Sequence, residues 1–205
     1  MELLAKLLGG QERVKIMRLF LHDDENSFSL HEISEKTKSK SALVRKELTA
    51  LSSVGFIEKK KGRGIVYSSK GSAIKDSIVF KLNKSFPHNQ ALKELLFDFE
   101  LLDKRELASR FKLIGRVKLF VVAGVFIGDA KSRVDILIVG EAIKRQKAEK
   151  ILDLLSAELG REVIYSIMDV EEYEYRYKMY DKFIRDILDS PHEKMIDKLS
   201  AKQMF

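Results

Sequence analysis

The sequence predicts an α+β protein of two domains, and three observations lead to this fold class. The chain has 205 residues, which suits two domains of roughly 100 residues each. Hydrophobic residues make up 45% and charged residues 34%, as in globular chains with a core. Helical periodicity dominates the first half, whereas apolar strand-like runs alternate with helices in the second. We therefore expect one domain over residues 1–94 and another over residues 95–205.

The composition excludes several kinds of site. Cysteine is absent, so the chain has no disulfide, no thiolate metal site and no catalytic thiol. The first residues, MELLAKLLGG, are too short and charged for a signal peptide, and no apolar run approaches the ~20 residues of a membrane helix. The histidines are scattered without metal-ligand spacing. We expect a cytoplasmic protein without a metal, a cofactor or a membrane partner.

Positive charge is concentrated in the first half of the chain. Residues 1–94 contain 18 Lys and Arg against 11 Asp and Glu, whereas residues 95–205 contain 20 of each kind. The excess is sharpest between Lys36 and Arg63, where nine basic residues face two acids. Such a patch indicates phosphate backbones as partners, although a solvated lysine-rich face has the same composition.

The chain begins with a strongly apolar helix. Residues 12–22 carry apolar side chains at nearly every inward position, and the glycine pair Gly9 and Gly10 precedes them. An extended piece, SFSL, follows, and HEISEKT then offers one to two helical turns. The polar turn KSKS leads from this short helix into the next one.

That next helix, ALVRKELTALSSVG, has the clearest apolar periodicity of the first half. Val44, Leu48 and Leu51 recur at spacings of four and three and predict one buried stripe. The polar residues on the other side of the helix are expected to face solvent. We expect the hydroxyl of Ser39 or Ser41 to cap its first turn and offer the helix amides to a phosphate.

A hairpin is expected after the second helix. Gly55 should end the helix in a left-handed conformation, and FIEKK should leave it as a strand. A second strand, SIVFKLN, is separated from the first by a long segment rich in lysine and glycine, which we interpret as a loop. A short helix, a tight turn, a second helix with a basic face and a hairpin wing form the arrangement that places a helix in the DNA major groove.

These first 60 residues, from LLGG to FIEKK, resemble the winged helix-turn-helix of ArsR/MarR-like prokaryotic transcriptional regulators. The resemblance implies a regulator that binds double-stranded DNA, usually as a homodimer on inverted half-sites. Ser39 departs from the family, which usually has an apolar residue at this point of the turn. Winged-helix domains can also bind proteins alone, but the concentrated charge favours DNA.

Physical chemistry gives the exposed polar residues different roles. Arg45 is the expected base-reading residue, because its guanidinium fork matches the acceptors of guanine. The lysines are expected to contact phosphates, which supplies affinity and little specificity. The expected DNA-binding residues are Lys38, Lys40, Ser41, Arg45, Lys46, Lys59, Lys60, Lys61 and Arg63.

The second half begins with a helical linker and continues as strands and helices. Residues 89–111 are expected to form one long helical region that joins the domains. Asp169 with Glu172 predicts a capping box, and EKMIDKLSAKQMF is expected to form a short amphipathic helix against a partner subunit. The elements between are expected to be strands at 118–124, 134–140 and 162–169 and helices at 141–160, 171–178 and 182–190.

Residues 105–190 resemble the minimal nucleotidyltransferase-like domain of the polymerase-beta type in this order of elements. The whole chain is therefore interpreted as an N-terminal winged helix-turn-helix followed by a nucleotidyltransferase-like α/β domain. In active members a Gly-Ser pair opens a phosphate-binding helix, and two aspartates one residue apart hold divalent metal. Mapped onto this chain, Gly124 and Gly128 match the glycines and Asp135 matches the second aspartate.

Two departures from that pattern argue against catalysis. Val125 stands at the serine position, and Arg133 stands at the position of the first aspartate. The chemistry needs two magnesium ions with hard oxygen ligands, and a permanent positive charge repels such ions. We therefore expect no catalytic residue and no enzyme activity in this domain.

Three interpretations of the second domain stay open from the sequence. Gly124, Gly128, Arg133 and Asp135 could bind a nucleotide effector without metal, as a remnant of the transferase site. Alternatively, the domain could serve only stability or dimer contacts. The rival is an active nucleotidyltransferase that modifies a protein, a tRNA or a small molecule.

Overall fold

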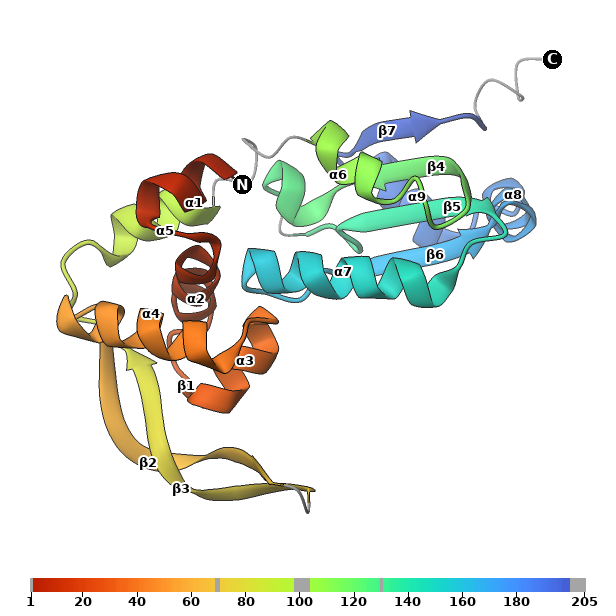
Figure 1. Ribbon diagram of the computed structural model, residues 1–205. Coiled ribbons are helices and arrows are strands. Elements are labelled where there is room, and N and C mark those ends of the chain that lie inside the picture. The colour runs from red at the N-terminus through yellow and green to blue at the C-terminus, as the bar shows by residue number, and fades with distance from the viewer. Residues whose placement is uncertain (1, 69–70, 98–103, 130, 200–205) are drawn as a thin grey trace. The chain divides into compact units, whose positions relative to one another are not determined.

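The computed structural model describes residues 2–68, 71–97, 104–129 and 131–199 and has mixed α+β secondary structure (Figure 1). The chain separates into two units. The first contains residues 1–98 together with 156–162, and the second contains residues 99–155 and 163–205. The boundary thus falls a few residues after the expected one, and the segment 156–162 groups with the first unit, which no local pattern in the sequence indicates.

The first unit is built from helices and one three-stranded sheet. Its sheet has the order β1-β3-β2, and both pairings are antiparallel. The core is formed by apolar side chains of four helices and the strands, and it includes the predicted stripe of Val44, Leu48 and Leu51. The elements are α1 (Glu2–Leu8), α2 (Gln11–His22), β1 (Ser27–Ser29), α3 (Leu30–Thr37), α4 (Ser41–Ser53), β2 (Ile57–Ser68), β3 (Gly71–Leu82) and α5 (Asn89–Phe97).

A reciprocal cap starts α3. The Ser29 hydroxyl accepts a hydrogen bond from the Glu32 backbone N–H, and the Glu32 carboxylate accepts one from the Ser29 N–H at 2.8 Å. This pair satisfies two of the four amides that a helix start leaves without intrahelical partners. The helix ends at Thr37, and the next residue, Lys38, adopts a left-handed conformation with φ of 51° and turns the chain towards α4.

Removing this cap gives a first stability prediction. Ser29→Ala is expected to lower the free energy of unfolding by about 1 kcal/mol, because the Glu32 amide loses its acceptor. Urea unfolding followed by circular dichroism measures the change. Ser27→Ala, an exposed serine at the start of β1, is the matched control and should leave the midpoint unchanged. Equal effects of the two variants would contradict a capping role.

The prediction of a long loop between the two hairpin strands is wrong. β2 and β3 pair continuously from Ile57 with Leu82 to Ser68 with Gly71, and residues 69 and 70 lie outside the described part. Gly62 and Gly64 of the predicted loop lie within β2 and allow close packing instead. A Cβ at Gly64 would lie 2.7 Å from the Ser29 Cβ, and one at Gly62 would lie 2.7 Å from the Val79 Cγ2.

The predicted linker helix is only partly present among the described residues. α5 ends at Phe97, and α6 (Lys104–Arg110) begins the second unit. The part of the predicted helix over residues 98–103 lies outside the described residues. Within the described ranges, no helix is both long and apolar enough to cross a membrane.

The second unit contains a mixed four-stranded sheet in the order β6-β5-β4-β7, in which β7 is Glu193–Asp197. β5 and β6 are parallel, whereas β4 is antiparallel to both of its neighbours. The predicted strands and helices of residues 116–189 are confirmed with shifted ends. They are β4 (Arg116–Val122), β5 (Ile136–Glu141), α7 (Arg145–Leu159), β6 (Tyr165–Asp169), α8 (Val170–Lys178) and α9 (Lys182–Asp189). A 3-10 turn, η2 (Gly124–Ile127), follows β4 in addition.

The expected C-terminal amphipathic helix is wrong for the residues that the structure describes. Glu193–Asp197 form strand β7, which pairs with the outer edge of β4 (Figure 1). An open strand edge presents backbone N–H and C=O groups that need partners, and this segment supplies them. Residues 200–205 of the predicted helix lie outside the described part.

Helices α8 and α9 cover one face of this sheet. Their Tyr173, Ile184 and Ile187 pack on apolar side chains of β4 and β5. Side chains that alternate with these on the strands point to the other face, where the ring of Phe120 lies 5.0 Å from that of Phe111. Asp169 caps α8, since its carboxylate accepts the Glu172 amide at 2.7 Å.

Candidate nucleic-acid interface

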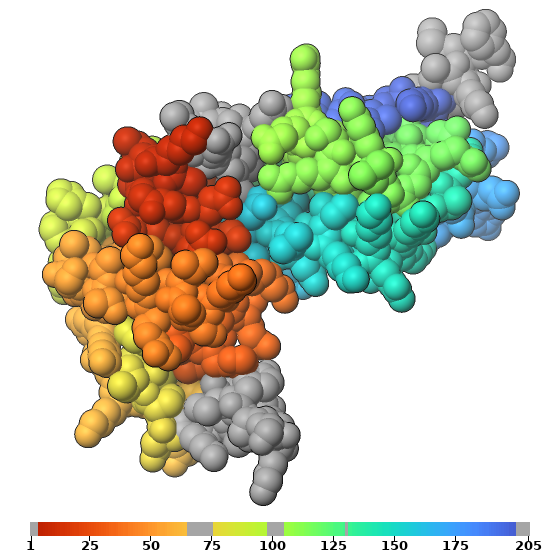
Figure 2. Space-filling view, in the orientation of Figure 1, coloured from red at the N-terminus to blue at the C-terminus, as the bar shows by residue number. Residues whose placement is uncertain are grey.

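All nine side chains that the sequence marks as DNA-binding are exposed. They come from three neighbouring places, namely the turn before α4, the first turns of α4 and the first half of β2. Val44, Leu48 and Leu51 point into the core from the same helix, so the polar residues of α4 occupy its solvent side. The orange side chains of α4 form part of the surface next to the yellow side chains of the hairpin (Figure 2).

The start of α4 differs from the expected cap. Lys40 occupies the cap position, and its side chain makes no capping hydrogen bond. The Ser39 hydroxyl donates to the Thr37 carbonyl at 3.2 Å, and the Ser41 hydroxyl lies 3.3 Å from that of Ser34. Neither serine therefore caps the helix, because the turn geometry directs both hydroxyls back towards α3.

A groove of about 510 Å³ lies between α4 and the hairpin. Arg45 and Thr49 border it from the helix, and Lys59, Ile78 and Phe80 border it from the strands. The fold thus brings Arg45 and Lys59 together on one concavity. The apolar pair Ile78 and Phe80 was not expected to take part, although the alternation in SIVFKLN would have placed both on one face of the strand.

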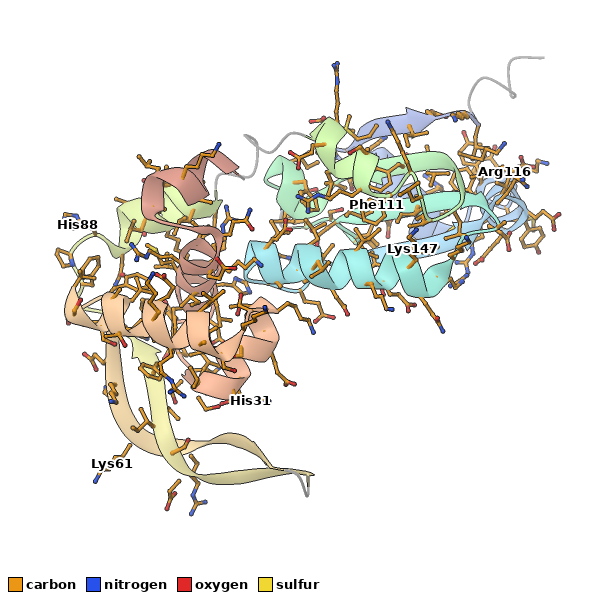
Figure 3. The ribbon with its side chains drawn as sticks, viewed as in Figure 1. His31, Lys61, His88, Phe111, Arg116 and Lys147 are labelled. Atoms are coloured by element: carbon orange, nitrogen blue, oxygen red, sulfur yellow. The ribbon has the colours of Figure 1, made fainter. Side chains whose placement is uncertain are left out.

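The strand register separates the hairpin lysines into two faces. Lys59 lies opposite Phe80, and Lys61 lies opposite Ile78, so both share the face that borders the groove. Lys60 points to the other face, where its Nζ is 2.6 Å from the Glu58 carboxylate. The side chain of Lys61 extends away from the hairpin into solvent (Figure 3). The sequence predicts that the three lysines act as one group, whereas the structure places Lys60 on a different face from the other two.

The two acids between Lys36 and Arg63 both form ion pairs. Glu47 is buried, and its carboxylate lies 2.6 Å from the Nε of Arg13 on α2. Glu58 pairs with Lys60, as described above. Neither carboxylate therefore presents an uncompensated negative charge to an approaching phosphate. The Arg13–Glu47 pair also ties α4 to α2, a contact between residues 34 positions apart that the local pattern could not predict.

One arginine of the first half is internal. Arg18 on α2 is buried, and its Nε donates to the Leu96 carbonyl at 2.8 Å. Burial lowers the pKa of Arg18 to about 10. This cation holds α2 against α5 and contributes nothing to the exposed basic surface.

Asp135 in the second unit is a structural acid. It is buried, and its two carboxylate oxygens accept hydrogen bonds from the backbone amides of Val125 at 2.8 Å and Ile164 at 2.9 Å. Its own backbone N–H donates to the Ile164 carbonyl. The side chain thereby joins the turn after β4 to the segment before β6, and its oxygens point inward.

The other residues of the expected nucleotide remnant have internal partners too. Gly124 has φ of 54°, and a Cβ there would lie 2.2 Å from Oδ1 of Asp135. Gly128 ends η2 in a left-handed conformation, and its N–H donates to the Gly124 carbonyl. Arg133 forms an ion pair with Asp186 of α9, with an Nε to Oδ2 distance of 2.6 Å. The fold brings Gly124 and Asp135 together, and it directs Arg133 to α9.

Within the described ranges, no group of three or more His, Asp or Glu side chains is placed to hold a metal ion. His31 lies on α3, whereas His88 lies in the turn before α5, away from it (Figure 3). No protein-family model matches this chain, and no curated protein or solved structure matches it either.

Proposed function

We propose that the chain is a transcriptional regulator that binds double-stranded DNA through α3, α4 and the β2–β3 hairpin, acting as a winged helix-turn-helix. The observation that carries this proposal is the exposure of the basic side chains around one helix and one strand that border a common groove. The two acids of this region, Glu47 and Glu58, are each paired with a cation and add no uncompensated negative charge to it. A surface of this kind suits the phosphates of a duplex.

In this proposal α4 enters the major groove. Its 13 residues span about 20 Å, enough to cross the groove, and its exposed side carries Ser41, Arg45 and Thr49. The hairpin would lie along the sugar-phosphate backbone, with Lys59 and Lys61 as phosphate contacts. The groove between Arg45 and Lys59 would receive the strand that passes between helix and hairpin. A homodimer would place two such helices on inverted half-sites.

We further propose that the second unit is a nucleotidyltransferase-like domain without catalytic activity, which serves sensing or dimer contacts. The hydrogen bonds of Asp135 support this, because a metal ion would have to displace two backbone amides from its oxygens. The pairing of Arg133 with Asp186 supports it as well, since a cation occupies the position where a second metal-binding acid would stand. Magnesium-dependent release of pyrophosphate from a nucleoside triphosphate by the wild type would overturn this part of the proposal.

Lys59 and Lys61 lie on one face of the hairpin and Lys60 lies on the other, and this difference provides the test of DNA binding. Lys59→Ala combined with Lys61→Ala should weaken binding to duplexes of any sequence by about tenfold at low ionic strength, since two phosphate contacts are lost. The slope of log K against log salt concentration should fall by about 2, at roughly 0.9 for each contact. Fluorescence anisotropy with a labelled duplex of random sequence measures both quantities.

Lys60→Ala is the matched control, because its ammonium group lies on the opposite face and pairs with Glu58. It should change affinity and salt slope by clearly less than Lys59→Ala or Lys61→Ala alone. Equal losses for all three lysines would show that the face assignment is wrong. No binding of the wild type to any duplex at low salt would remove the regulator proposal. Selection of bound genomic fragments then identifies the operator.

A further inference from the structure

A second cavity lies entirely within the second unit. It has a volume of about 570 Å³ and is formed by α8, α9 and β7. Volumes of about 300 to 1,000 Å³ are typical of small-molecule sites. Its lining includes three tyrosines, Tyr173, Tyr177 and Tyr180, and the cations Lys178, Arg185 and Lys194. None of these residues belongs to the loop that resembles a transferase site.

The backbone at Tyr180 is held in an unfavourable conformation. α8 ends in a Schellman motif, in which the Asp181 amide donates to the Arg176 carbonyl at 2.9 Å and the Tyr180 amide to the Tyr177 carbonyl. The residue in the left-handed position of this motif is usually glycine, since a Cβ is strained there. Here it is Tyr180, with φ of 54°.

The ring of Tyr180 gains little from packing within the chain. The residue is 77% exposed, although it lines the cavity. A strained backbone that presents a large exposed aromatic ring at the edge of a cavity is poorly explained by stability. It is well explained by a ligand that stacks on that ring.

The remaining tyrosines give the cavity an aromatic wall. The rings of Tyr173 and Tyr177 are stacked at 6.0 Å with an angle of 22° between their planes. Tyr173 is buried, and burial, followed by the charges of Tyr177 and Asp197, raises its pKa to about 12. Its hydroxyl therefore stays protonated at neutral pH and can donate a hydrogen bond.

Positive charge exceeds negative charge around the cavity. Arg185 lies 3.6 Å from Asp189, and Lys194 lies 3.2 Å from Asp197, so these two cations are balanced by acids. Lys178 adds a further exposed cation at the end of α8. An anionic group is therefore favoured over a cationic one.

We propose that this cavity binds a nucleoside monophosphate, whose base stacks on Tyr180 and whose phosphate lies near Lys178 and Arg185. The combination of a planar aromatic ring and one anionic group matches the exposed tyrosine and the excess of cations. The site is separate from Gly124, Gly128, Arg133 and Asp135, and the proposal holds whether or not the first unit binds DNA.

The test uses the full chain, without divalent metal, in isothermal titration calorimetry with AMP, GMP, CMP and UMP. At least one of them should bind to the wild type. Tyr180→Gly should weaken that binding at least tenfold, since the stacking surface is lost. The same substitution should raise the melting temperature by about 2 to 4 °C, because glycine adopts the left-handed conformation without strain. A more stable variant that binds less well cannot be explained by misfolding.

Three further variants make the result specific. Tyr180→Phe keeps the ring and should retain binding. Tyr175→Ala removes another exposed tyrosine of α8, one that does not line the cavity, and should leave binding unchanged. Arg133→Ala should also leave it unchanged, and a loss there would assign the nucleotide to the loop after β4 and overturn the proposal.

Two other results would overturn the proposal. One is the absence of binding of all four nucleotides to the wild type. The other is a wild type that binds no nucleotide and self-associates in sedimentation experiments, while Tyr180→Gly does not self-associate. That result would make this surface a contact between copies of the chain.

Discussion

Replacing Asp135 by alanine is expected to lower the free energy of unfolding of the second unit by roughly 2 to 4 kcal/mol, because two buried backbone amides lose a charged acceptor. The carboxylate bridges the Val125 and Ile164 amides, which belong to segments on either side of β5. Guanidinium unfolding followed by circular dichroism measures the loss. Five of the six tyrosines belong to the second unit and provide a second, near-ultraviolet signal for it.

Arg133→Ala is the matched control for this prediction. Arg133 is two residues away and half-exposed, and its pair with Asp186 is of the surface type, which contributes about 0 to 1 kcal/mol. Gly124→Ala disturbs the same contact independently, because its Cβ would collide with the Asp135 carboxylate. It should therefore also lower the free energy of unfolding. A fully stable Asp135→Ala protein would contradict the structural role.

The same experiment bears on catalysis. Acids that hold a metal repel one another when the metal is absent, so removing one of them usually leaves stability unchanged or raises it. Loss of stability in Asp135→Ala would therefore match an acid that bonds to the backbone. It also means that lost activity in this variant alone could not identify a catalytic acid, and the wild-type assay for pyrophosphate release decides that point.

Arg45→Ala is expected to remove most of the discrimination between the operator and random duplexes. A bidentate contact from arginine to guanine contributes about 1 to 3 kcal/mol, or roughly 5- to 150-fold in the specificity ratio. Arg45 is exposed on α4 and borders the groove, so its fork can reach base edges in the proposed complex. Competition between labelled operator and unlabelled random duplex measures the ratio.

Arg45→Lys is the matched control, because it keeps the charge and loses the planar fork. It should retain non-specific affinity and still lose discrimination. Lys46→Ala, which removes a neighbouring exposed cation, should weaken binding to both duplexes equally. A specificity ratio that survives both Arg45 variants would show that another residue reads the bases.

Most of the secondary structure could be predicted from the sequence, because its signals are local. The stripe of Val44, Leu48 and Leu51 is buried as its periodicity predicts, and Gly55 and Gly160 end their helices with φ of 78° and 72°. The exposure of Arg45 follows from the same periodicity, since the helix has only one apolar face. Which residues face solvent on α4 was therefore determined by the order of residues within one helix.

Two of the predictions that failed concerned segments with two possible local interpretations. Glycine and lysine between residues 59 and 76 have the composition of a loop, but pairing with the opposite strand makes them a continuous ladder. Glu193–Asp197 has the composition of an amphipathic helix, but it forms a strand that pairs with the open edge of β4. In both cases hydrogen bonds to a distant strand outweigh a weak local preference.

The sequence by itself determined the α+β class, the concentration of cations in the first half and the absence of a second acid two residues before Asp135. The tertiary structure alone decided that Lys59 and Lys61 share one face of the hairpin while Lys60 lies on the other, that Asp135 turns inward to two amides, and that Tyr180 stands at a cavity built from α8, α9 and β7. The physical reason is the distance along the chain over which each effect acts. Propensity and periodicity act between neighbours, whereas register, burial of a charge and the shape of a cavity depend on residues that meet only when the chain has folded.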